Sequence, residues 1–213
     1  NREYAPRTGP PLGERVSVVS TGIGCPSTAI AVEELIEAGA DTFIRVGSSG
    51  SMQPYVHTGD VVVVTAAIRD EGTTSHYLPM EFPAVAHIDV INALSAGAKT
   101  LGLKFHTGIC QSKDSFYGEV ERPRMPMAQH LADRWNAWIA GGAVCSEMEA
   151  AALFIISAIH RKRAGGAMLV INESDLAEVD DTDAAKHMAE FDADRVIKVA
   201  IEGLKQLITA DRT

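Results

Sequence analysis

The chain has 213 residues, of which 46% are hydrophobic and 22% are charged, as in an ordinary globular protein with a single core. Its formal net charge of -9 argues against a nucleic-acid partner, because the phosphate backbone would be repelled. No apolar run reaches the length of a membrane span, and no basic start followed by an apolar stretch suggests a secretory signal.

Predicted strands and helices alternate along the chain. The first half predicts a strand over 15–20, a helix over 27–38 that ends at Gly39, and strands over 41–46 and 60–68. The four valines of 61–64 are typical of a strand that is covered on both faces. The second half predicts strands over 104–111 and 167–172 and helices over 87–101, 127–139, 147–160 and 183–208.

This alternation is typical of α/β proteins, in which helices cover a sheet on both faces. We therefore expect a three-layer α/β/α sandwich with a mainly parallel central sheet, built as one domain over residues 1–213. Pro6 to Gly13 is rich in proline and glycine and predicts a turn between strands, not a linker between domains.

Glycine-rich turns are expected after two of the predicted strands. Thr21-Gly22-Ile23-Gly24 follows the first, and Gly47-Ser48-Ser49-Gly50 follows the strand that contains Arg45. Ligands of such sheets bind at the carboxyl ends of strands, so the two turns should share one rim. Exposed backbone N–H groups beside a guanidinium suit a phosphate-sized anion, although Gly-Ser-Ser-Gly alone could equally be an ordinary flexible turn.

Glu147-Met148-Glu149 places two carboxylates around a methionine. A carboxylate can accept several hydrogen bonds, and a thioether is a soft group that packs well against a ligand. Spacing alone does not decide the role, because acidic residues are also common at the start of a helix.

The cysteines and histidines give little sign of chemistry. Cys25, Cys110 and Cys145 are odd in number and far apart, so we expect reduced thiols in a cytoplasmic protein. Cys25 lies in a glycine-rich turn but has no histidine near it in the sequence, which argues against a nucleophile. The seven histidines show no metal-ligand spacing.

Five segments, in this order, resemble the nucleoside phosphorylase superfamily, and most closely its uridine phosphorylases. They are STGIGCPS at 20–27, ADTFIRVGSSG at 40–50, TGDVVV at 58–63, KDSFY at 113–117 and SEMEAAALF at 146–154. The resemblance covers nearly the whole chain. It implies a pentosyltransferase of nucleotide salvage that converts a nucleoside, here expected to be uridine, and phosphate into free base and ribose 1-phosphate.

Three alternatives remain open. One is a purine nucleoside phosphorylase, another is a hydrolase of the superfamily that uses water, and the third is a non-catalytic nucleoside-binding protein of the same fold. Arg45 and Ser48 argue against the hydrolase, and Arg45 with Glu149 argues against the mere binder, because neither would need a phosphate site beneath the sugar.

The resemblance also implies roles for residues at the phosphate and ribose. Phosphate would be bound by Arg45, Gly47 and Ser48, with Arg2 of the partner subunit reaching into the same site. Ribose would be bound by Ser49, Glu147, Met148 and Glu149. Because Arg2 acts across subunits, we expect a homo-oligomer built from dimers, with a hexamer as the expected assembly.

At the base the sequence departs from the family. Phe116 would stack on the base and Arg122 would donate to a base carbonyl, but the glutamine expected nearby is replaced. Its ungapped position is Val120, and a shift of one residue makes it Glu119. Purine phosphorylases of the superfamily carry, after a similar strand, an aspartate that contacts purine N7. Asp175 lies at about the matching position in this chain.

Two further expectations come from the resemblance. Glu3, Ile23 and Ser27 match positions that bind a monovalent cation such as potassium between two subunits, and oxygen ligands suit such a cation. No other cofactor is expected. The chain also starts some way into the usual family sequence, which suggests that an amino-terminal segment is absent from this numbering.

Overall fold

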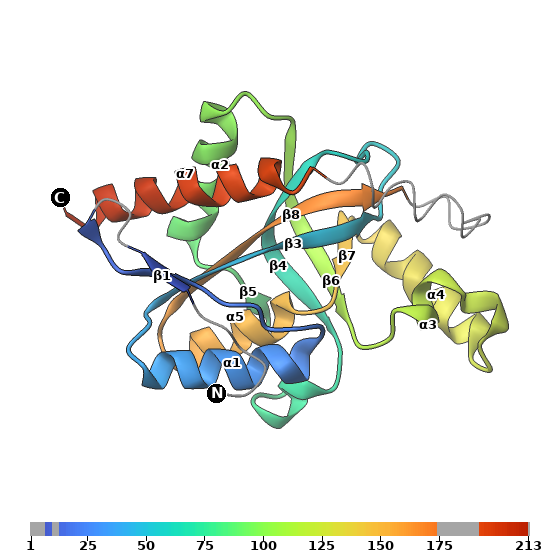
Figure 1. Ribbon diagram of the computed structural model, residues 1–213. Helices are drawn as coiled ribbons and strands as arrows, with labels where there is room; N and C mark the ends of the chain where they lie inside the picture. The colour runs from blue at the N-terminus through green and yellow to red at the C-terminus, as the bar shows by residue number, and fades with distance from the viewer. Residues whose placement is uncertain (1–6, 10–12, 174–191, 213) are drawn as a thin grey trace.

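The computed structural model describes residues 7–9, 13–173 and 192–212, drawn in colour in Figure 1. Two short strands near the start, β1 (Arg7–Gly9) and β2 (Val16–Val18), pair antiparallel with each other in a small sheet of their own. The other described strands are β3 (Thr42–Ser51), β4 (Val61–Asp70), β5 (Ala84–Val85), β6 (Phe105–Lys113), β7 (Cys145–Glu147) and β8 (Arg163–Asn172).

These six strands form one central sheet that closes on itself. Their order is β5-β4-β6-β7-β3-β8, and β4 pairs in addition with β8. The pairings β3–β8, β4–β6 and β6–β7 are parallel, whereas β3–β7, β4–β5 and β4–β8 are antiparallel. The sheet is therefore mixed, because β7 runs against β3 and β4 runs against β8, but its two longest pairings, β3–β8 and β4–β6, are parallel.

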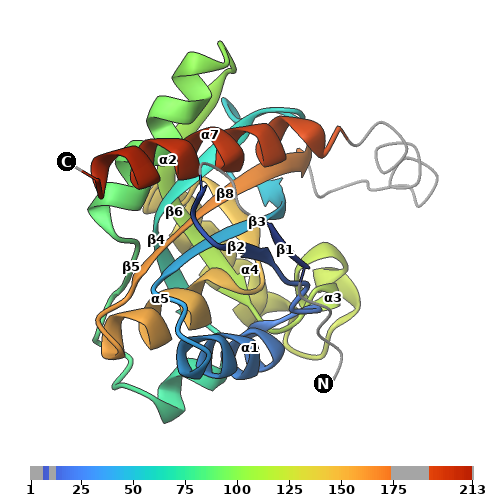
Figure 2. The same cartoon turned by 60° about the vertical axis from the view of Figure 1, so that its left-hand side comes forward.

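Helices cover the sheet on two sides, which confirms the α/β fold class. In Figures 1 and 2, α2 (Ile88–Thr100) and α7 (Asp194–Ala210) lie on one side, and α1 (Cys25–Glu37) and α5 (Ala150–Ile159) lie on the other. The short α3 (Tyr117–Val120) and α4 (Ala128–Ala140) pack together at one end of the molecule, beside the 3-10 turn Arg122–Arg124. A second 3-10 turn spans Thr73–His76.

The valines of β4 show why the sheet needs both layers. Val62 and Val64 belong to the core shared with α1 and α5, whereas Val61 and Val63 belong to the core shared with α2 and α7. All four are fully buried. Successive side chains of a strand point to opposite faces, so an uninterrupted apolar run requires a cover on each side. The expected coverage of this strand is confirmed.

Two predicted boundaries near the candidate site are wrong. Gly47-Ser48-Ser49-Gly50 is not a turn but part of β3, because Gly50 and Ser51 pair with Ser146 and Cys145 of β7. The helix expected from Glu147 begins at Ala150, and Cys145–Glu147 is a strand instead. Among the described residues, every helix is too short or too polar to cross a membrane.

Candidate active site

Arg45 is held between two carboxylates where β3 meets β7. Its Nε lies 3.0 Å from Oε2 of Glu147, and its Nη2 forms an ion pair with Oε2 of Glu149. The Glu147 side chain is fully buried, and the side chains of Glu149 and Arg45 are 9% and 15% exposed. Antiparallel pairing of β3 with β7 brings the arginine and the Glu-Met-Glu segment together, although they are a hundred positions apart.

The two carboxylates are themselves fixed by backbone donors. Glu147 accepts hydrogen bonds from the N–H groups of Glu149 at 2.8 Å and Ala150 at 3.0 Å, and from the hydroxyl of Ser112. It therefore binds the first turn of α5 in addition to Arg45. Oε1 of Glu149 accepts from the N–H of Gly24 at 2.6 Å. Gly24 and Arg45 thus both contact the carboxylate of Glu149, one through each oxygen.

The charge of this cluster is unbalanced. Burial by itself lowers the pKa of Arg45, but the carboxylates of Glu147 and Glu149 outweigh it, so the pKa lies above its ordinary value and the guanidinium stays charged. One cation faces two anions. A phosphate dianion that approached Arg45 would meet a net negative site, and it would need further positive charge to bind there.

Gly47 leaves room for the Arg45 guanidinium. A Cβ at position 47 would lie 2.3 Å from Nη1 of Arg45 and 2.9 Å from Cζ. The same guanidinium donates from Nη1 to the sulfur of Met168 at 2.5 Å, and Met168 pairs with Gly47 across β3 and β8. Sequence reasoning missed Met168, because only the register of β8 brings it beside the arginine.

The remaining predicted phosphate and ribose residues differ in exposure. Ser48 is exposed on β3, whereas Ser49 is buried and its hydroxyl donates to the carbonyl of Leu169 at 3.4 Å. Met148 is half-buried beside Glu149. Of these three residues, only Ser48 is exposed to solvent.

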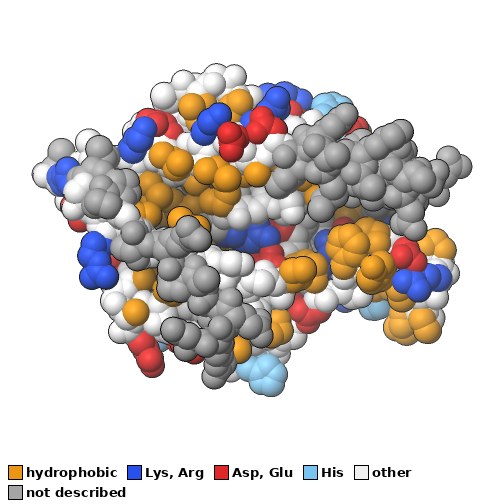
Figure 3. Space-filling view, viewed as in Figure 1, with side chains coloured by type: hydrophobic (Ala, Val, Ile, Leu, Met, Phe, Trp, Pro, Cys, Tyr) orange, Lys and Arg blue, Asp and Glu red, His pale blue; other side chains and the backbone are white. Residues whose placement is uncertain are grey.

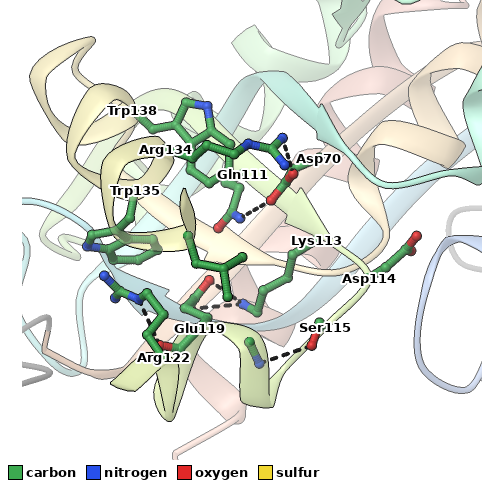
Figure 4. Close-up of a pocket in the computed structure, with 12 residues that line it drawn as sticks. Asp70, Gln111, Lys113, Asp114, Ser115, Glu119, Arg122, Arg134, Trp135 and Trp138 are labelled. Carbon is green, nitrogen blue, oxygen red and sulfur yellow. Dashed lines mark hydrogen bonds and ion pairs between the residues drawn. The ribbon is translucent and has the colours of Figure 1, made fainter. Parts of the chain in front are cut away.

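A second group of polar residues surrounds a cavity of about 200 Å³ between β6, α3 and α4 (Figure 4). Glu119 and Arg122 line it, whereas Val120 and Phe116 do not. Phe116 is 52% exposed and packs edge-to-face on Tyr117. Arg122 donates from Nε to the Glu119 carbonyl at 3.0 Å, and its guanidinium lies 4.6 Å from the centre of the Trp135 ring. Of the two candidates for the missing glutamine, Glu119 is the one that reaches the cavity.

Lys113 and Glu119 form the centre of a buried polar network in this cavity. The Lys113 ammonium lies 3.1 Å from the Glu119 carboxylate and donates to the Ser146 hydroxyl at 2.6 Å. Ser146 is also 2.7 Å from Glu119 and 2.6 Å from the Gln111 carbonyl oxygen.

A second part of the network lies on the α4 side. The Gln111 amide donates to Asp70 at 2.7 Å, and Asp70 forms an ion pair with Arg134. Burial raises the pKa of Asp70 above its ordinary value. Sequence reasoning missed these residues, since β4, β6, β7 and α4 meet here only in the fold.

The cavity and the Arg45 cluster adjoin each other through β7. Ser146, which contacts Lys113 and Glu119, and Glu147, which contacts Arg45, are consecutive residues of that strand. The fold has therefore brought an arginine-carboxylate cluster next to a polar, tryptophan-lined cavity.

The comparison with known families agrees with this arrangement. The model of the phosphorylase superfamily matches residues 2–209. The chain belongs to this superfamily. It is 47% identical to a uridine phosphorylase of Treponema pallidum, over 99% of this chain and 80% of that protein. It is 37% identical to the uridine phosphorylase of Escherichia coli, over 92% of this chain and 77% of that protein.

A relative that acts on a purine nucleoside is also similar. The chain is 33% identical to a guanosine phosphorylase of Halorubrum lacusprofundi, over 97% of this chain and 83% of that protein. Membership of the phosphorylase superfamily therefore spans both pyrimidine and purine nucleosides among these relatives.

Several residues expected from the phosphorylase resemblance cannot be placed. Arg2, Glu3 and Asp175 lie outside the described residues. Of the expected cation ligands that are described, Ile23 is 78% exposed, and the Ser27 hydroxyl donates to the Thr21 carbonyl. Within the described ranges, the structure contains no group of three or more histidine, cysteine, aspartate or glutamate side chains suited to a metal ion.

The three cysteines of this phosphorylase-superfamily chain are free and buried. Burial raises the pKa of Cys25 and of Cys110 well above the ordinary value, and burial together with Glu147 raises the pKa of Cys145 to about 12. All three are therefore protonated thiols near neutral pH, and the pKa of Cys25 argues against a nucleophilic role.

Proposed function

We propose that this protein is a uridine phosphorylase. Phosphate oxygen forms a bond to C1′ of the ribose, the bond from C1′ to N1 of uracil breaks, and the electron pair leaves with the base. Hydrogen phosphate gives up its proton as it bonds to C1′, the departing uracil anion takes up a proton at N1, and the products are uracil and ribose 1-phosphate. The observation that carries the proposal is Arg45 fixed between Glu147 and Glu149, in a chain 47% identical over nearly its full length to a uridine phosphorylase.

The cluster can serve both the phosphate and the ribose. Arg45, with Gly47 and Ser48 beside it on β3, would hold the phosphate. Glu149, with Met148 and Ser49, would hold the ribose hydroxyls, and Glu147 would orient the arginine. No covalent intermediate is needed, so positioning and electrostatic stabilisation of the positively charged sugar supply the rate enhancement.

The net negative charge of the cluster supports a contribution from a second chain. Arg2 of the partner subunit would supply the positive charge that phosphate needs beside Glu147 and Glu149. Figure 3 shows hydrophobic side chains gathered over β3 and α7, where a second copy could pack. Exposed apolar residues of β2, β3 and α7 include Val18, Val46, Ile197 and Ile201.

This sharing of sites can be tested by mixing chains. An Arg2→Ala chain mixed with a Glu149→Ala chain should regain activity only if one hybrid site receives both intact residues.

Glu3, Ile23 and Ser27 would hold a potassium ion between the same two subunits, and added potassium should then raise the melting temperature of the assembly more than added sodium. Sedimentation velocity would distinguish a dimer from the expected hexamer.

At the base, Glu119 and Arg122 line the cavity next to the cluster and would face the polar edge of uracil. Phe116 would stack on the ring from its exposed position on the rim. The cavity holds both charged donors and aromatic rings, which fits a planar and polar base.

A purine nucleoside is the second candidate. The guanosine phosphorylase relative supports it, as does Asp175, whose carboxyl group could contact purine N7. Asp175→Asn should abolish any cleavage of inosine or guanosine while leaving uridine cleavage nearly unchanged. If inosine or guanosine is the better substrate and Asp175→Asn abolishes its cleavage, the protein is a purine nucleoside phosphorylase.

The decisive experiment is a panel of nucleosides incubated with and without phosphate, followed by release of free base. Uridine should be cleaved when phosphate is present and should remain intact when it is absent. Equal rates in phosphate-free buffer would mean that water is the acceptor and that the protein is a hydrolase. Binding without cleavage under either condition would favour a nucleoside-binding protein.

A further inference from the structure

We propose that Lys113 and Glu119 act together as the pair that recognises the uracil edge. Glu119 accepts the hydrogen bond from N3–H, and Lys113 donates to the neighbouring carbonyl oxygen. The inference rests on the proposed function and assigns to Lys113 a substrate contact that the resemblance does not provide.

The first support is position. Both side chains line the same cavity, and the ammonium lies 3.1 Å from the carboxylate. Lys113 is the last residue of β6, and Glu119 lies on α3 six positions later, so the intervening chain folds back to bring the charges together. The side chains are 7% and 10% exposed, which places the pair where a ligand would meet little competing water.

The second support is unused hydrogen-bonding capacity. An ammonium has three N–H donors, and in the part of the chain that the structure describes two groups surround that of Lys113: both carboxylate oxygens of Glu119 at 3.1 Å and the hydroxyl of Ser146 at 2.6 Å. The two oxygens of one carboxylate can share a single N–H, and the third donor can then turn to a ligand. Each carboxylate oxygen has two lone pairs, and Oε1 of Glu119 receives only the ammonium among the described groups. A donor and an acceptor are thus available side by side in one cavity.

The third support is the order of charges. In the view of Figure 4, the Glu119 carboxylate lies between the Lys113 ammonium and the Arg122 guanidinium. Arg122 uses Nε for the Glu119 carbonyl, and among the described residues its terminal nitrogens have no hydrogen-bond acceptor and can donate to a ligand. The cavity therefore presents donor, acceptor and donor in sequence. The uracil edge presents carbonyl, N3–H and carbonyl, which is the complementary pattern.

This arrangement accounts for the missing glutamine. A glutamine amide provides one acceptor and one donor, whereas a carboxylate provides acceptors only. The ammonium of Lys113 restores the donor that Glu119 lacks. Cytosine presents an amino group and an unprotonated N3 to the same positions, so both contacts would be mismatched, and cytidine should be rejected.

A purely structural ion pair is the competing explanation. Burying two charges costs free energy unless hydrogen bonds compensate it, and the contacts of Ser146 to both partners provide such compensation. A structural pair would affect stability but would not change the ratio of rates among substrates. Base selectivity therefore separates the two explanations.

The experiment starts with the wild-type protein, phosphate and three substrates: uridine, N3-methyluridine and cytidine. Phosphate-dependent cleavage of uridine must be seen first, because its absence would reject the proposed function and not this inference alone. The ratio of kcat/KM for uridine over N3-methyluridine and over cytidine is then compared among variants.

Lys113→Met should raise the KM for uridine at least about tenfold, with a smaller change in kcat, because one hydrogen bond to the base is lost. Lys113→Arg should restore part of the affinity. The matched control is Lys104→Met, which removes a lysine-aspartate pair at the other end of β6 and should leave all three substrate ratios unchanged.

The double variant Lys113→Met/Glu119→Leu keeps the folding test separate, since it removes both charges together and leaves neither partner buried alone. Because neither side chain can then bind N3–H or the neighbouring carbonyl oxygen, discrimination between uridine and cytidine should fall at least about tenfold. If Lys113→Met, or this double variant, keeps the wild-type substrate ratios, the pair is structural and the inference is overturned.

Discussion

Arg45 depends on Gly47 as much as on its two carboxylates. The Cβ of any other residue at position 47 would lie 2.3 Å from the arginine Nη1. The clashing atom belongs to the far end of a flexible side chain, so the guanidinium can move away while the strand remains intact. A small change at position 47 should therefore disturb the chemistry without unfolding the protein.

We expect Gly47→Ala to lower kcat/KM for uridine roughly a hundredfold, the scale of losing one well-placed electrostatic donor. The urea midpoint of unfolding should change little. Thr42→Ala is the matched control, because it alters the far end of the same strand. Full activity in Gly47→Ala would show that the observed position of the guanidinium is unimportant for catalysis.

At the scale of elements, helices α2 and α7 approach each other through two glycines. A Cβ on Gly97 of α2 would lie 2.9 Å from the Val199 carbonyl oxygen and 3.0 Å from the Gly203 nitrogen of α7. On the other side of the contact, a Cβ on Gly203 would lie 2.9 Å from a methyl group of Leu94. Backbone atoms cannot move aside as a flexible side chain can, so the close contact requires glycine at position 97.

Gly97→Ala should therefore destabilise the protein by about 1–3 kcal/mol, the usual cost of overpacking. Helix propensity alone would predict the opposite sign, since alanine favours a helix over glycine by about 1 kcal/mol. Urea denaturation, which measures the free energy of unfolding, shows whether overpacking or helix propensity dominates. Lys99→Ala, at an exposed position of the same helix, serves as the control and should have little effect.

Across the whole molecule, Asp60 ties together three strands of the closed sheet. Its carboxylate accepts from the Lys104 ammonium at 2.7 Å and from the His57 N–H at 3.0 Å, and it lies 2.8 Å from Nε2 of His106. Its backbone carbonyl accepts from the N–H of Val170 in β8 at 2.9 Å. Residue 60 thus connects the start of β4 with the start of β6 and the end of β8.

Because of this connection, the free energy of unfolding should depend on pH in the acid range. Burial alone would raise the pKa of Asp60, but the hydrogen bonds from Lys104, the His57 backbone and His106 outweigh it, so the pKa lies below its ordinary value. The stabilisation is therefore complete above the unfolded-state pKa of about 4 and is lost as the pH falls through the folded-state value.

Asp60→Asn should reduce stability at pH 7 and flatten the decline of the unfolding free energy between about pH 5 and pH 3. Urea unfolding at a series of pH values measures both effects. Asp133→Asn changes an exposed aspartate on α4 and is the control. If the unfolding free energy of Asp60→Asn falls at acid pH as steeply as that of the wild type, other carboxyl groups cause the decline.

The sequence by itself predicted most of the helices and strands, and it singled out Arg45, Glu147 and Glu149, which the structure brings into contact. The uninterrupted valines of 61–64 require cover on both faces, and glycine, arginine and carboxylate residues stand in recognisable local segments. Only tertiary structure decided that Gly47–Gly50 continues β3, because that extension depends on pairing with β7. It also decided that β4 pairs with β8 and closes the sheet.

The cavity between β6, α3 and α4 shows the same division most clearly. KDSFY was visible in the sequence, but the contacts of its lysine exist only because α3 brings Glu119 within 3.1 Å and β7 places Ser146 beside both. Hydrophobic periodicity reports which faces are buried, since it reflects contacts repeated along one element. Contacts between single polar residues of β4, β6, β7 and α4 have no such period, so strand register and helix packing alone decide them.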